Sequence, residues 1–161
     1  AVMPLVISLQ PLIFGISQLV TALQISVFFA IGLYKVRKPG SLLIMALMMG
    51  LIQLMMSPPM FLSSILNGVL IELIVLLLFR GYEKDAAVFV AAMLHTPLSL
   101  PFNYLYNRLI KGADSPLAVV ADRAPLAAVG MTLAVVAVSA LGALIGIKIA
   151  GELKKSGVLK K

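Results

Sequence analysis

The chain has 161 residues, of which 61% are hydrophobic and 12% are charged, and its mean hydropathy is +1.11. A soluble domain usually carries about 25% charged residues, so we predict an all-α integral membrane protein with one transmembrane domain over residues 1–161. The absence of cysteine excludes disulfides, thiolate metal sites and a cysteine nucleophile. The net charge of +7 is assigned to basic residues at helix ends, not to a nucleic-acid site.

Five segments are apolar enough to cross a bilayer, which takes about 20 residues of helix. The predicted segments are 12–36, 41–57, 61–80, 86–110 and 124–150. Residues 1–11 contain Pro4 and Pro11 and predict a loop or a short re-entrant piece, because each proline removes a helical hydrogen-bond donor. The connections 81–85 and 111–118 are polar and contain turn residues.

The basic residues divide unequally between the two sides of the membrane if the five segments alternate in direction. Ten of the 13 then share one side: Lys35, Arg37, Lys38, Arg80, Lys84, Lys148, Lys154, Lys155, Lys160 and Lys161. The positive-inside rule assigns that side to the cytoplasm, so we expect a multi-pass plasma-membrane protein with a cytoplasmic C-terminus. Five crossings place Ala1 outside, and a bundle with both ends inside needs one more helix before it.

Glu72 lies in the middle of the apolar stretch "LNGVLIELIVLLLFR" and is the only acid within an apolar segment. A charged side chain at bilayer depth costs about 2.5–3.5 kcal/mol on insertion scales, so we do not expect it to face lipid. The sequence offers no lysine or arginine at its depth, which favours a ligand or an ion as its partner. The alternative is a residue that is protonated, or bonded to a neighbouring helix, and that only locks packing.

Four further polar side chains lie in the predicted segments, namely Gln53, Asn67, His95 and Asn103. Each needs hydrogen bonds in an apolar medium. For any one of them alone, a hydrogen bond between helices is the simpler interpretation. Taken together they predict a polar chamber between segments two, three and four.

The fourth segment contains Pro97 and Pro101, which predict a broken helix of the kind that lines a cavity. Tyr104 follows at once and offers a ring face to a flat heterocycle. For Tyr106 the interpretation is an aromatic residue at the membrane interface.

In the fifth segment Gly142, Gly146 and Ala150 recur every four residues and predict a face for close helix packing. The chain has no phosphate-binding glycine-rich loop, no Ser–His–Asp order and no cluster of metal ligands. We therefore expect neither an enzyme nor a resident cofactor.

Four stretches occur in a characteristic order: "VRKPGSLLIMALMMGLIQLMMSPPM", "LNGVLIELIVLLLFR", "FNYLY" and "GELKK". Over roughly residues 20–160 this pattern resembles the substrate-binding S components of energy-coupling-factor vitamin importers. The likeness is to the YkoE-like branch, which is associated with thiamine and its hydroxymethylpyrimidine precursor. In that branch a basic-Lys-Pro-Gly turn opens the third helix, and an amide-Gly-x-x-x-Glu pattern lies on the fourth, here Asn67, Gly68 and Glu72.

The resemblance implies a six-helix S-component fold whose first helix is missing from this sequence. It also implies a subunit that captures a vitamin and docks on a coupling transmembrane subunit with two ATPase subunits. Glu72 would then meet the positive charge or the aminopyrimidine of the ligand through a charge-assisted bond. Tyr104 would stack on the ring, and Asn67 and Asn103 would orient it. The expected site also includes His95 and Gln53, the latter standing where the branch carries an acid.

Two other functions remain open. The chain is alternatively a non-catalytic accessory subunit of a larger membrane complex, in which Glu72 is structural or part of a proton relay. A third hypothesis is a small self-sufficient secondary transporter, although such proteins usually show internal repeats and none is found here.

Overall fold

The computed structural model describes residues 16–55, 58–112 and 114–158, and nearly all of them are helical. The helices are α2 (Ile16–Val36), α3 (Ser41–Leu54), α4 (Pro58–Phe79), α5 (Asp85–Leu109), α6 (Pro116–Arg123) and α7 (Pro125–Lys155). Four of them, α2, α4, α5 and α7, are long and apolar enough to span a membrane. The predicted all-α membrane bundle is confirmed. The expectations for residues 1–11 concern a segment outside the described residues.

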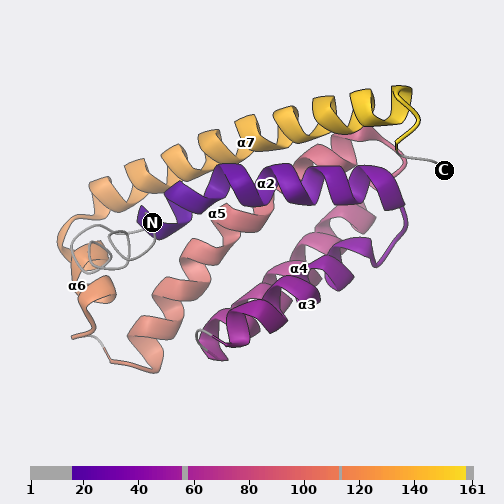
Figure 1. Cartoon of the computed structure of the whole chain (residues 1–161). Helices are drawn as coiled ribbons and strands as arrows, with labels where there is room; N and C mark the ends of the chain where they lie inside the picture. Colours follow the sequence, from indigo (N-terminus) through magenta and orange to yellow (C-terminus); the bar gives the residue numbers. More distant parts are fainter. Residues whose placement is uncertain (1–15, 56–57, 113, 159–161) are drawn as a thin grey trace.

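The second predicted segment is the exception in length. Helix α3 has 14 residues and is therefore about 21 Å long, less than the hydrocarbon thickness of roughly 30 Å. It forms a hairpin with α4, and this hairpin lies beside α2 and α5 (Figure 1). Helices α2 and α7 run side by side in the same direction, and α5 runs past both in the opposite direction.

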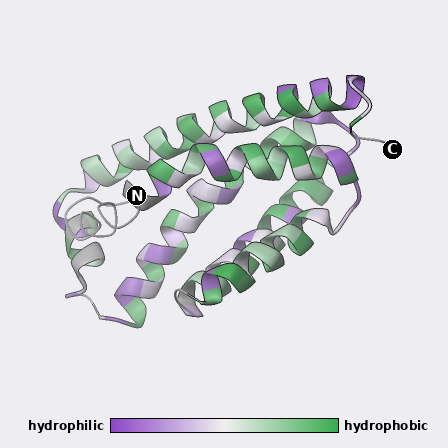
Figure 2. Cartoon of the chain, viewed as in Figure 1, coloured by the Kyte–Doolittle hydropathy of each residue, from purple (hydrophilic) through white to green (hydrophobic). Residues whose placement is uncertain are grey.

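This arrangement separates two ends of the bundle. Helices α2 and α7 end, and α3 and α5 begin, at what we call the basic end, which is defined by Lys35, Arg37, Lys38, Arg80, Lys84, Lys148, Lys154 and Lys155. Arg108, Lys111 and Arg123 lie toward the opposite end, which we call the far end. Figure 2 shows hydrophilic residues where α2 and α7 finish and hydrophobic ones along α3, α4 and α7. The predicted one-sided distribution of basic residues therefore holds for the described part of the chain.

Small side chains bring α2 and α7 together. A Cβ atom added at Gly142 or at Gly146 would lie 2.7 Å from a backbone carbonyl oxygen of α2. At Gly142 it would also lie 3.0 Å from Cβ of Ser26, and at Gly146 2.6 Å from Cβ of Ala30. The predicted packing face of α7 is thus confirmed, and its counterpart is a matching row of small residues on α2. Without side chains between the backbones, dispersion contacts replace the hydrophobic effect as the attractive force.

Glycines also allow α3 and α4 to pack closely within their hairpin. A Cβ atom at Gly68 of α4 would lie 2.6 Å from Cβ of Ala46 on α3, and Gly50 of α3 packs against Phe61. Gly68 is therefore explained by helix packing, one turn before Glu72.

The fourth segment is not broken, so that prediction is wrong: α5 continues through Pro97 and Pro101. Each proline removes a single backbone donor, and a membrane helix tolerates this because its neighbours hold the flanking turns in place. Pro97 is buried among such neighbours. Helix α6 was not predicted, since Pro116, at its first residue, lies in what looked like a polar loop. Proline is well suited to that position because its missing N–H has no helical partner there.

We expect Gly146→Ala to destabilise the fold by about 1–3 kcal/mol, because the added methyl group overpacks a contact with rigid backbone. The measurement is the thermal unfolding midpoint in mild detergent. Gly151→Ala is the matched control, since a Cβ atom there has nothing within 4 Å. Equal midpoints for the two variants would contradict the proposed packing.

Candidate functional site

Both carboxylate oxygens of Glu72 have partners inside the protein. Oε1 accepts a hydrogen bond from the backbone N–H of Gly40 at 2.7 Å, and Oε2 accepts one from the hydroxyl of Tyr82 at 2.9 Å. The residue is buried, with 7% of its surface exposed. The expectation that Glu72 lacks an internal partner is therefore wrong. Its partners are not cations but a loop amide and a phenol, which sequence inspection for lysine and arginine does not detect.

The donors come from the two loops at the basic end. Gly40 follows the Lys-Pro pair between α2 and α3 and has φ 85°, a left-handed conformation that favours glycine. This conformation at the start of α3 leaves the backbone N–H of Gly40 free to donate to a side chain of α4. Since Glu72 lies seven residues before the end of α4, it is only about 10 Å from the basic end. The carboxylate thus holds the α2–α3 loop against α4.

Tyr82 belongs to the short connection between α4 and α5 and is fully buried. Burial raises the pKa of its phenol above the ordinary value, and the hydrogen bond to Glu72 and the charge of that carboxylate raise it further. The phenol therefore stays protonated and remains a donor to Glu72 over the physiological pH range.

Arg37 makes a second set of contacts at the same end of the bundle. Arg37 donates to the carbonyl oxygens of Tyr34, at 3.2 Å, and of Glu83, and it forms an ion pair with Asp85. Its guanidinium also lies 4.0 Å from the centre of the Tyr34 ring. The end of α2 is thereby joined to the start of α5. Arg37, Gly40 and Tyr82 were not among the predicted functional residues, because only the fold brings them to Glu72 or to its loops.

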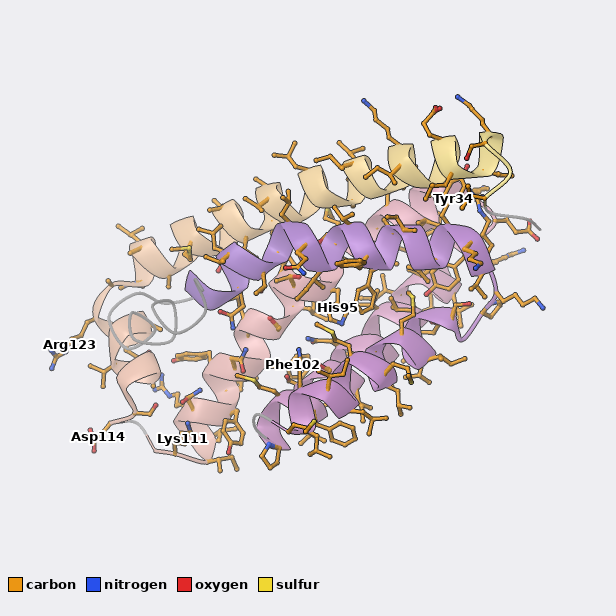
Figure 3. All side chains as sticks on the ribbon, viewed as in Figure 1. Tyr34, His95, Phe102, Lys111, Asp114 and Arg123 are labelled. Atoms are coloured by element: carbon orange, nitrogen blue, oxygen red, sulfur yellow. The ribbon has the colours of Figure 1, made fainter. Side chains whose placement is uncertain are left out.

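Two of the predicted polar residues lie in the middle of the bundle with an unpartnered atom. Asn67 on α4 is 1% exposed and His95 on α5 is 4% exposed. Within the described residues, Asn67 Oδ1 and His95 Nε2 have no hydrogen-bond partner. The His95 ring packs against Phe29 of α2, with 4.2 Å between the ring centroids. Figure 3 shows His95 near the middle of the bundle. The two residues lie about 18 Å and about 15 Å from the basic end of their helices, so they share nearly the same depth.

Gln53 is used within the α3–α4 hairpin. Its Oε1 accepts a hydrogen bond from the hydroxyl of Ser64, which lies one turn before Asn67 on α4. The amide therefore joins the two helices near the depth of Asn67, as the simpler interpretation of an isolated polar residue predicts.

Tyr104 and Asn103 lie elsewhere, toward the far end of α5. The hydroxyl of Tyr104 donates to Asp122 of α6 at 2.7 Å, and Arg108 forms an ion pair with the same carboxylate at 3.0 Å. The backbone carbonyl oxygen of Asn103 accepts a hydrogen bond from the side-chain amide of Asn107 in the same helix. Tyr104 is about 28 Å along α5 from its start beside Tyr82, so it does not share a site with Glu72.

The predicted set is therefore divided into three groups along the bundle. Glu72 belongs to the basic end, Gln53, Asn67 and His95 to the middle, and Asn103 and Tyr104 to the far end. Among the described residues of this set, buried side-chain atoms without a hydrogen-bond partner occur in the middle group alone. Among the described residues, no group of three His, Cys, Asp or Glu side chains is placed to hold a metal ion.

Comparison of the chain with models of protein families, with curated proteins and with solved structures finds no match.

We expect Tyr82→Phe to destabilise the protein by about 1–3 kcal/mol, because it leaves a buried carboxylate oxygen without its donor. The unfolding midpoint in detergent measures this effect. Tyr106→Phe is the matched control, since the contact of Tyr106 with Lys111 is made by its ring and survives the change. An unchanged midpoint for Tyr82→Phe would show that the hydrogen bond between Tyr82 and Glu72 does not stabilise the protein.

The same bond predicts a loss of stability at alkaline pH. The phenol of an unfolded chain loses its proton near pH 10, whereas the pKa of Tyr82 in the folded protein is higher. Above about pH 10 the unfolded state thus binds fewer protons, and stability falls as pH rises. We expect the difference in midpoint between the wild type and Tyr82→Phe to be constant up to pH 9 and to shrink at pH 11. A difference that does not change with pH would contradict the bond.

Proposed function

We propose that the chain is the membrane-embedded, non-catalytic substrate-binding subunit of an energy-coupling-factor importer. In this function it captures a water-soluble vitamin, with thiamine or its pyrimidine precursor favoured, and partner subunits drive uptake with ATP. The order of the Lys-Pro-Gly turn, the Asn67-Gly68-Glu72 pattern and the "FNYLY" stretch supports the proposal. The basic end is the cytoplasmic end in this proposal, and the C-terminus lies there.

The observation that carries the proposal is the pair of unpartnered buried atoms, Asn67 Oδ1 and His95 Nε2. A buried acceptor without a donor costs about 1–3 kcal/mol, and a ligand that supplies the donor recovers this free energy. An aminopyrimidine presents an N–H donor and a ring nitrogen acceptor on one edge, which suits an amide oxygen and an imidazole. The surrounding apolar side chains match the usual lining of a small-molecule site.

The geometry changes the roles within this proposal. Asn67 and His95 become the principal ligand residues, and Gln53 supports them from the hairpin. Glu72 acts one turn closer to the basic end, and it reaches a ligand only if the bonds from Gly40 and Tyr82 are shared or exchanged. Asn103 and Tyr104 belong to the far end, where ligand enters from outside in the proposed orientation.

One observation favours a second candidate function, the accessory subunit of a larger membrane complex. Both oxygens of Glu72 are satisfied within the chain, as expected of a residue that only locks packing.

The test is to purify the chain in mild detergent, denature it and identify released small molecules by mass spectrometry. We expect a stoichiometric thiamine-like compound, and a loss of affinity of at least tenfold in Asn67→Leu, which removes the acceptor while keeping the branched shape of the side chain. The control is Ser63→Ala, because the Ser63 hydroxyl bonds, among the described residues, only to the backbone of Met60 in its own helix. Glu72→Gln distinguishes a ligand contact from a lock, since only a ligand contact lowers affinity without lowering the unfolding midpoint.

Failure to release a compound, together with no binding of added vitamins, would favour the accessory subunit. Uptake in whole cells provides the remaining distinction. Transport that requires ATPase partners supports the importer, whereas transport by the chain alone would contradict it.

A further inference from the structure

The lipid-facing sides of α3, α4 and α7 are apolar. Their exposed positions carry no polar side chain until Lys148, in the last two turns of α7. Lys148 is about 10 Å from the end of its helix, a depth from which a long lysine side chain can extend toward the basic end. The exposed residues on α3 and α4 are Ile44, Leu47, Met48, Leu51, Ile52, Leu54, Met60, Leu62, Leu66, Val69, Leu70, Leu73, Leu77 and Leu78, with Pro58 at the start of α4. These faces suit hydrocarbon.

Helix α2 differs, because its outward face carries Gln24. The residue is exposed, and Val20 and Phe28, one turn to each side, are 46% and 64% exposed. The opposite side of the helix, with Ala22, Ser26 and Ala30, is buried in the bundle. Gln24 lies 12 residues before the end of α2, about 18 Å from the basic end and thus deep in the membrane. Within the described residues no group forms a hydrogen bond with its amide.

An amide that faces hydrocarbon is unfavourable unless it is paired. We propose that the Val20–Gln24–Phe28 face of α2 is the contact surface for a second copy of this chain. Two copies inserted in the same direction hold Gln24 at the same depth, so a two-fold axis along the membrane normal brings the two amides together. A primary amide is both donor and acceptor, and the pair can exchange two hydrogen bonds.

The apolar residues around Gln24 suit the same contact. Val20 and Phe28 lie at i−4 and i+4, so they continue the stripe along one face of the helix. Polar side chains at the centre of such a stripe are a known means of joining membrane helices. This proposal does not depend on the proposed function, and its test uses no ligand.

Because the chain has no cysteine, crosslinking can be tested against a zero background. Phe28→Cys is the reporter, since it keeps Gln24 in place. Leu66→Cys is the matched control, as Leu66 is exposed on α4 at nearly the same depth, about 19 Å from the basic end. We expect oxidation in native membranes to give a disulfide-linked dimer with Phe28→Cys and not with Leu66→Cys.

The role of the amide is tested in the Phe28→Cys background. We expect Gln24→Leu to weaken dimerisation roughly tenfold, the size expected for two membrane hydrogen bonds, and Gln24→Asn to retain most of it. A second measurement does not need the Phe28→Cys substitution: the mass of the cysteine-free chain in detergent, with and without Gln24→Leu, reports whether it is a dimer. Equal crosslinking at the two reporters, no dimer at Phe28, or a dimer indifferent to Gln24→Leu would each overturn the proposal.

Discussion

The bond between Glu72 and the two loops at the basic end is the interaction on which the rest of the bundle depends. In hydrocarbon no water satisfies a polar group, so a carboxylate at this depth needs donors from the protein. Gly40 and Tyr82 supply them from the α2–α3 and the α4–α5 connection. A single side chain on α4 thereby sets how four consecutive helices meet at one end, and Arg37 reinforces the same end from α2.

Tight backbone packing is confined to particular pairs of helices in the described part of the chain. The glycines of α7 and of the α3–α4 hairpin bring helix backbones into contact, which leaves no room for a ligand there. Two unpartnered buried atoms, Asn67 Oδ1 and His95 Nε2, belong to α4 and α5. In the proposed function, these rigid contacts hold the helices while a small molecule is exchanged in the middle of the bundle.

Much of the fold follows from local features of the chain. Apolar segments of helical length give the spans, and the four-residue spacing of Gly142, Gly146 and Ala150 gives the packing face. The prolines of α5 misled the prediction, because tertiary contacts keep the helix continuous despite two missing donors. Helix α6 was missed because its eight residues begin within what looked like a polar loop. For the candidate site, the residue types were recognisable, but their grouping was not.

By itself, the sequence determined the class of protein, four of the five predicted spans and the asymmetry of charge, because hydrophobicity and charge act residue by residue. The tertiary structure alone decided that Glu72 is satisfied from within, that Tyr104 pairs with Asp122, and that Gln24 faces outward. Those outcomes depend on the rotation of each helix about its axis and on which loop lies next to which helix. Both are set by the packing of all helices together, and no local pattern of residues contains them.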